Sequence, residues 1–350
     1  MMALAHEQQR SGPLSDDRLL HKDAFSRLDE SDDSLFYATD RFVQHLDAAA
    51  LDTVEQLIGS LIGEESSVIL DLMAGWDSHI TGTLKPRRVV GLGLNGNELA
   101  RNRALTEWVI HDLNRDPKLP FPDGMFDVVV NTVSVDYMTQ PVEVFCEVGR
   151  ILKPGGLFLV TFSNRMFEGK ATRIWRDSGE AERVDMVEEI FGLAGVFDKP
   201  SVFISKGRPR PRDDKYAHLG IPSDPIYAVY ADRTGGSGKK RSTPQPYASK
   251  FAPEELERRM ADVKETLRCP HCDKRLRKWA VSQNPFCEWD TDFLYVCFND
   301  ECPYLVRGWE VMFKQGNRGL SYRFSYHHLR DRCMSVPVPT LHAGKDGIID

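Results

Sequence analysis

Five short apolar runs constrain the fold of this chain more than any other feature of its sequence. They read SSVILDLM (66–73), RRVVGLGL (87–94), EWVIH (107–111), MFDVVVNTVSV (125–135) and GLFLVTFS (156–163). Runs that are apolar on both faces, with helices between them, are typical of a parallel sheet covered on both sides. The sequence therefore predicts an α/β, doubly wound domain built from five strand–helix units.

Patterned segments on either side of these runs complete the predicted domain. Residues 48–63 place apolar side chains at helical spacing and end on Gly63, and residues 141–152 do so between a first-turn proline and Pro-Gly-Gly. A helix over 179–197 and two closing strands, SVFISK and DPIYAVYA, follow. We expect one domain over 35–231, preceded by a polar, mobile segment over 1–34.

The composition changes after residue 231. Residues 232–250 are rich in Gly, Ser, Pro and Lys and predict a linker. A charged helix and a cysteine-rich module are expected over 251–331, with a C-terminal tail over 332–350. Five of the seven cysteines fall in this module.

Four of those cysteines form two short-spaced pairs, CPHC (Cys269, Cys272) and CFNDEC (Cys297, Cys302). Two such pairs separated by a hairpin-sized insert suit a tetrahedral thiolate site for zinc. The pattern resembles a zinc ribbon of the ogr/Delta-like kind. Cys287 is expected to be a spare thiol and His271 a turn residue.

Charge and hydropathy narrow the class of protein. The chain has 350 residues, 41% of them hydrophobic, and a net charge of -7. The acidic balance argues against nucleic-acid binding by the whole chain. KRLRKWAV, with Arg307, forms either a local basic face for nucleic acid or a solvated strand exterior. No run is long and apolar enough to span a membrane, no export signal is recognisable, and we expect a cytoplasmic protein.

Residues 119–164, LPFPDGMFDVVVNTVSVDYMTQPVEVFCEVGRILKPGGLFLVTFSN, carry a resemblance that the order of the five runs extends over 67–163. This part of the chain resembles a class I S-adenosylmethionine-dependent methyltransferase of the type-eleven group. The resemblance implies a Rossmann-like, seven-stranded sheet. It also implies that the cofactor's methionine end lies over the first strand's turn, its ribose by the second strand and its adenine by the third.

The family's first motif, D-x-G-x-G-x-G, reads DLMAGWD here, so only its middle glycine is kept. The motif places Asp71, Met73, Gly75 and Asp77 at the cofactor's methionine end. Glycine is used there because the backbone approaches the ligand and can need a positive φ. Asp77 either accepts from the cofactor's ammonium group or caps a following helix.

The second and third strand ends carry the other cofactor candidates. Relatives commonly have an acidic residue for ribose where this chain has Gly93; Asn95 or Glu98 substitutes for it, or both form a capping box. Asp112, with the amide of Leu113, fits the adenine position, or caps a turn. Asn131, in the fourth apolar run, is a further candidate cofactor-binding residue.

Methyl transfer is an in-line displacement that mainly requires alignment, with a base where the acceptor needs deprotonation. Asp136 and Tyr137 are the candidate proton acceptors; the alternative is that they form pocket walls or loop. Upstream, Tyr37, Arg41, Phe42 and His45 could gather over the site. A methyltransferase with an unidentified acceptor is the favoured function. The alternatives are a scaffold that has lost cofactor use, and a protein that the ribbon directs to nucleic acid or to a protein partner.

Overall fold

The computed structural model describes residues 18–19, 21–63, 67–80, 84–236, 241, 251–281 and 290–350. They belong to two compact units, which are treated separately below. The first unit comprises residues 1–45, 54–203 and 227–242, and the second comprises 46–53, 204–226 and 243–350. Within the described ranges, no helix is both long and apolar enough to cross a membrane.

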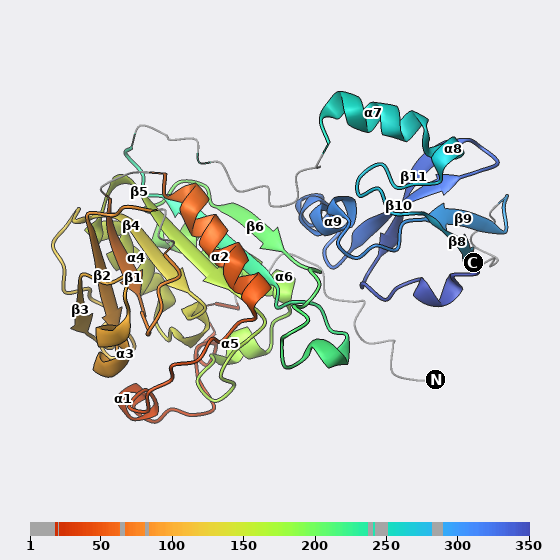
Figure 1. Ribbon diagram of the computed structural model, residues 1–350. Helices are drawn as coiled ribbons and strands as arrows, with labels where there is room; N and C mark the ends of the chain where they lie inside the picture. Colours follow the sequence, from red (N-terminus) through yellow and green to blue (C-terminus); the bar gives the residue numbers. More distant parts are fainter. Residues whose placement is uncertain are drawn as a thin grey trace. The chain divides into compact units, whose positions relative to one another are not determined.

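A seven-stranded sheet forms the centre of the first unit (Figure 1). Its strands are β1 (Val68–Leu72), β2 (Arg88–Gly93), β3 (Glu107–Ile110), β4 (Phe126–Thr132), β5 (Leu152–Phe162), β6 (Ser201–Ser205) and β7 (Ile226–Asp232), in the order β3-β2-β1-β4-β5-β7-β6. Strands β1 to β5 are parallel, and β7 is antiparallel to β5. Every residue of β1 is buried, which explains its continuous apolar run. The predicted doubly wound α/β fold is confirmed.

Helices cover both faces of this sheet (Figure 1). The helices and short turns between residues 33 and 219 are α1 (Asp33–Phe36), α2 (Ala48–Leu61), α3 (Gly96–Arg101), η1 (Val135–Tyr137), α4 (Pro141–Ile151), α5 (Arg173–Arg176), α6 (Glu180–Ala194) and, in the second unit, η2 (Ala217–Leu219). Helices α4 and α6 pack together through Phe145 and Phe191, whose ring centroids are 4.9 Å apart. Pro141 begins α4, and Gly195 ends α6 with a φ of 67°. The helices predicted at 48–63, 141–152 and 179–197 are thus confirmed.

The crossover from β1 to β2 differs from the prediction. We expected a strand–helix unit here, but none of residues 73–80 and 84–87 is helical. Asp77 accepts from the amide of His79 in a tight turn, and His79 has a φ of 53°, which an α-helix does not allow. The connection from β3 to β4 is also a loop. A parallel pair needs a crossover of about a dozen residues, usually but not always helical.

The described part of the N-terminal segment is anchored rather than mobile from Ala24 on. The amides of Arg173 and Ile174 donate to the carbonyls of Ser26 and Ala24. Arg27 donates both of its bonds to Asp33 at 2.8 Å, and both side chains are less than 10% exposed. Within the described part of this segment, the charged side chains of Arg27 and Asp33 are buried as an ion pair.

The second unit contains a four-stranded antiparallel sheet. Its elements are α7 (Pro253–Ala261), α8 (Val263–Thr266), β8 (Arg277–Ala280), β9 (Phe293–Val296), α9 (Pro303–Lys314), β10 (Ser321–His327), β11 (Arg332–Val338) and η3 (Lys345–Gly347), with the strand order β11-β10-β9-β8. Strand β11 pairs with β10 along its whole length, and the amide of Ile349 donates to Lys278. Residues 332–350 are therefore part of this module rather than a tail. Cys287 and most of the predicted linker lie outside the described residues.

Candidate cofactor and metal sites

The turn after β1 lies directly against the end of β2. The amide of Ala74 donates to the carbonyl of Leu92 at 2.8 Å. A Cβ atom on Gly93 would lie closer than 3.0 Å to the carbonyl oxygen of Ala74. This turn therefore leaves no space for a side chain at Gly93, the position at which an acidic residue is common in relatives.

Met73 occupies the first glycine position of the family motif and adopts a φ of 61°. The position thus has the left-handed backbone that glycine adopts freely and other residues adopt at a cost of about 1–2 kcal/mol. Met73 therefore has a backbone conformation that glycine would adopt without this cost.

Asp71 is buried at the end of β1, and burial raises its pKa to about 7. Ser78 hydrogen-bonds to it and in turn accepts from Asn102, which also donates to the carbonyl of Gly75 at 2.9 Å. This network fixes the turn to the residues that follow α3.

Asn95 is the N-cap of α3, since its side-chain oxygen accepts from the amides of Asn97 and Glu98. Its amide nitrogen donates to the carbonyl of Tyr37, and Glu98 accepts from the amide of Arg41. The capping alternative is therefore what the structure shows for Asn95. Both side chains hold the N-terminal segment against the end of β2.

Asp112 lies in the loop after β3 and accepts from the amide of Asn114 at 2.9 Å, while Leu113 is buried. At the end of β4, Asn131 is fully buried and donates to the carbonyl of Leu72 and to Ser134. Its side-chain oxygen has no hydrogen-bond partner among the described atoms. A buried acceptor of this kind is rare unless a ligand or water completes it.

Asp136 and Tyr137 lie in η1 and are both buried. Burial raises the pKa of Asp136 to about 7, and within the described part of the chain its Oδ2 accepts no hydrogen bond. Burial also raises the pKa of Tyr137, whose hydroxyl oxygen accepts from the amide of Phe167. Of the two, Asp136 has the free acceptor atom.

Two of the four upstream candidates lie against Phe167. His45 lies 5.4 Å from its ring centroid, and the guanidinium of Arg41 lies 5.6 Å from it. Tyr37 is half-buried near Asp136, and burial raises the pKa of its hydroxyl. Phe42 lies apart from them, against Trp76 and Arg101.

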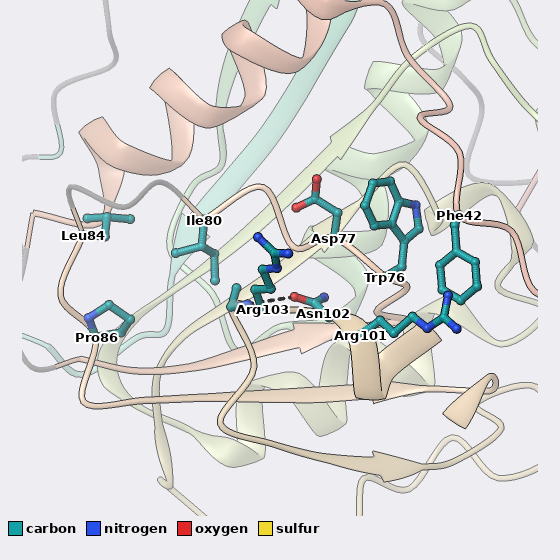
Figure 2. Close-up of a pocket in the computed structure, with 10 residues that line it drawn as sticks. Phe42, Trp76, Asp77, Ile80, Leu84, Pro86, Arg101, Asn102 and Arg103 are labelled. Carbon is teal, nitrogen blue, oxygen red and sulfur yellow. Dashed lines mark hydrogen bonds between the residues drawn. The ribbon is translucent and has the colours of Figure 1, made fainter. Parts of the chain in front are cut away.

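A pocket of about 910 Å³ opens beside the β1 turn (Figure 2). Of the predicted cofactor residues, only Asp77 lines it, half-exposed, with its carboxylate accepting from the amide of His79 and from Gln44. The complete lining is Phe42, Trp76, Asp77, Ile80, Leu84, Pro86, Arg101, Asn102, Arg103 and Ala104. Sequence reasoning missed Arg101 and Arg103 because a short charged helix end gives no signal of its own.

The four cysteines of the two pairs come together in the second unit. Cys269 and Cys302 have their sulfurs 3.8 Å apart, and Cys272 and Cys297 have theirs 3.6 Å apart. All four sulfurs lie within 4.8 Å of one another. A tetrahedral zinc site with Zn–S bonds of about 2.3 Å requires sulfurs about 3.8 Å apart. The geometry suits zinc, and His271 stacks on Tyr304 rather than joining the cluster.

Comparison with known proteins finds a family match within the first unit. The family described as "Methyltransferase domain" matches residues 72–160. This segment is similar to that domain and lies within the first unit. The match includes the β1 turn, Asn131 and Asp136.

Two curated relatives are from Mycolicibacterium smegmatis. One, named as an S-adenosylmethionine-dependent methyltransferase, is 32% identical over 121 residues, which are 32% of this chain and 47% of the relative. The other, a fatty-acid O-methyltransferase, is 38% identical over 93 residues, which are 25% of this chain and 32% of the relative. The chain thus spans about half of the first and a third of the second.

Among solved structures, an S-adenosylmethionine-dependent methyltransferase from Mesorhizobium loti is 18% identical, and the alignment covers 52% of this chain and 100% of that one at a TM-score of 0.35. A score of that size does not bear on function.

Proposed function

We propose that this protein transfers a methyl group from S-adenosylmethionine to an acceptor that is still to be identified. The observation that carries the proposal is the β1 turn of the methyltransferase domain. Met73 holds the left-handed conformation of the motif, and Gly93 gives the turn its close approach to β2. Ligands of open α/β sheets bind at this edge, outside the carboxyl ends of the strands.

The residues at this edge fit the cofactor at its methionine end. The unpartnered oxygen of Asn131 is a buried acceptor for an ammonium group, and the backbone of Met73 to Gly75 forms the adjoining turn. Asp112 and Leu113 supply a carboxylate and an amide for adenine. The bound cofactor would supply an electrophilic methyl group on a sulfonium, so that the protein's main task is alignment.

Asp136 is the proposed proton acceptor. Its pKa of about 7 lies near the working pH, where a general base is most effective. Its buried Oδ2 has no hydrogen-bond partner among the described residues, and it would take the proton of an alcohol or amine acceptor that enters beside η1. Tyr137 positions the neighbouring chain by accepting from Phe167.

We also propose that Cys269, Cys272, Cys297 and Cys302 bind zinc. Three of them are buried and the fourth is half-buried, so that burial of the thiolates is balanced by the metal's charge. The support for this proposal is their sulfur spacing. In a module of this size the metal would contribute much of the folding free energy.

Calorimetric titration of the zinc-replete protein with S-adenosylmethionine and S-adenosylhomocysteine tests the enzymatic proposal. We expect micromolar binding, weakened at least about tenfold by Asp112→Ala, because a carboxylate hydrogen bond to the adenine amine contributes roughly 1.5–3 kcal/mol. Asp116→Ala is the matched control, because Asp116 lies in the same loop and likewise accepts one amide, that of Lys118. Absence of heat up to millimolar ligand would favour the scaffold alternative.

A further inference from the structure

We propose that the pocket of Figure 2 is a binding site for an amphipathic organic anion, that is, a carboxylate or phosphate joined to an apolar chain. The site goes beyond the proposed function, because its lining shares only the β1 turn with the predicted cofactor residues. The inference does not depend on cofactor binding. Its support is the charge, shape and composition of the lining.

The lining carries two cations that have no anionic partner. Arg101 and Arg103 form no ion pair with any residue that the structure describes, and both side chains are exposed at the pocket. The guanidinium of Arg101 lies 4.3 Å from the ring centroid of Phe42, which holds it in place. Asp77, the only carboxylate of the lining, already accepts from His79 and Gln44. The lining is therefore cationic, and guanidinium groups are well suited to carboxylate and phosphate.

Three aliphatic side chains of the lining lie together on one side of the pocket. In Figure 2, Ile80, Leu84 and Pro86 are on the left of the pocket, and Phe42 and Arg101 are on the right. Arg103 lies between these two groups. All three apolar side chains are half-buried, so that a hydrocarbon placed on them would lose contact with water. A ligand that fits has an anionic head for Arg103 and Arg101 and an apolar part for the left-hand side.

The crossover loop explains why a pocket exists here. Residues 73–87 connect two parallel strands, and their described part contains no helix that would pack over β1 and β2. Asn102 instead ties the loop to the end of α3 through Gly75 and Ser78. The volume of about 910 Å³ lies within the range of small-molecule sites, about 300–1,000 Å³.

The test is calorimetric titration of the full-length, cofactor-free protein with decanoate below its micelle concentration. We expect saturable binding of decanoate and binding at least about tenfold weaker for 1-decanol, which has the same chain without the charge. Arg103→Gln should weaken decanoate binding by a similar factor, and Arg101→Gln should also weaken it. Arg87→Gln is the control, because Arg87 is exposed next to Pro86 but does not line the pocket.

Several outcomes would overturn the proposal. These are no saturable heat with decanoate, equal binding of decanoate and decanol, or equal effects of Arg103→Gln and Arg87→Gln. A fourth is that S-adenosylhomocysteine competes with decanoate and Arg103→Gln abolishes binding of both, which would assign the pocket to the cofactor. Arg103 and Arg87 are both exposed, so that neither substitution should disturb packing. A melting temperature equal to that of the unsubstituted protein establishes that each variant is folded. Failure of cofactor binding alone would leave the decanoate result intact.

Discussion

Replacing Gly93 by alanine tests the central geometry of the site with a single added methyl group. Its Cβ would lie closer than 3.0 Å to the carbonyl oxygen of Ala74, which belongs to the backbone and cannot rotate away. That carbonyl must retreat by roughly 1 Å to reach ordinary contact. The retreat strains the hydrogen bond from Ala74 to Leu92 and moves the turn that starts at Met73.

The expected cost follows from that displacement. Overpacking of this kind costs about 1–3 kcal/mol, and loss of a backbone hydrogen bond adds about 1 kcal/mol. We therefore expect Gly93→Ala to lower the free energy of unfolding by about 2–4 kcal/mol. For a unit of this size each kcal/mol corresponds to about 2–4 °C, so that the melting temperature should fall by roughly 4–16 °C. Cofactor affinity should fall at least about tenfold, because the turn itself has moved.

Gly96→Ala is the matched control three residues further along the chain. A Cβ there would meet only the end of the Ile110 side chain, at 3.7 Å, and Gly96 is the first residue of α3. Alanine should be neutral or stabilising by about 0.5–1 kcal/mol at that position. The measurements are differential scanning calorimetry and cofactor titration of both variants. A Gly93→Ala protein as stable and as tightly binding as the Gly96→Ala protein would refute the argument that Gly93 is kept for close approach.

Three further predictions follow from buried charges and from the cysteines. Burial raises the pKa of Asp71 and Asp136 from 3.8 to about 7. Their contribution to the free energy of unfolding is therefore complete below about pH 4 and is lost as the pH rises through 7. Asp136→Asn should make the free energy of unfolding fall less steeply over that range, as urea titrations at pH 4 to 8 would show. Lys170, fully buried and 3.1 Å from Asp33, should cost about 3 kcal/mol when replaced by Met, with Lys153→Met as the exposed control, and equal melting temperatures for the two variants would contradict this. Removing zinc with a chelator, or Cys272→Ser, should abolish the near-ultraviolet signal of the tyrosines that pack in the same cluster as the cysteines, Tyr295, Tyr304 and Tyr326; a signal that persists in a demonstrably metal-free protein would exclude a structural zinc site.

The sheet could be predicted from the sequence because its central strands are buried on both faces. β1 reads VILDL and β4 reads FDVVVNT, and only a covered parallel sheet needs such runs. The order of these strands along the chain was predicted on the same basis. The cysteine cluster was predictable because metal ligands leave a spacing in the sequence that packing alone does not require.

Other features depend on contacts between distant residues, which a local pattern does not record. Strand β11 was missed because RCMSVPV contains a proline and alternates at an edge, where pairing with β10 decides its conformation. The missing crossover helix depends on the turn that Asp77 makes with His79. The position of Arg101 and Arg103 beside the crossover loop could not be predicted, because it depends on the hydrogen bonds of Asn102, between them, to Gly75 and Ser78.

Backbone strain at the strand ends argues that the altered glycine motif has kept its geometry. Met73 after β1 and Val133 after β4 both have positive φ values, 61° and 52°, and a β-branched residue there is especially unfavourable. Strain of this kind persists only where surrounding bonds hold it, and Asn131 supplies them by joining Leu72 on one strand to Ser134 beyond the other. A turn that served only to connect two strands could relax at either position. The two turns are instead held together at the edge where the unpartnered oxygen of Asn131 lies, as expected of a site that is formed before its ligand binds.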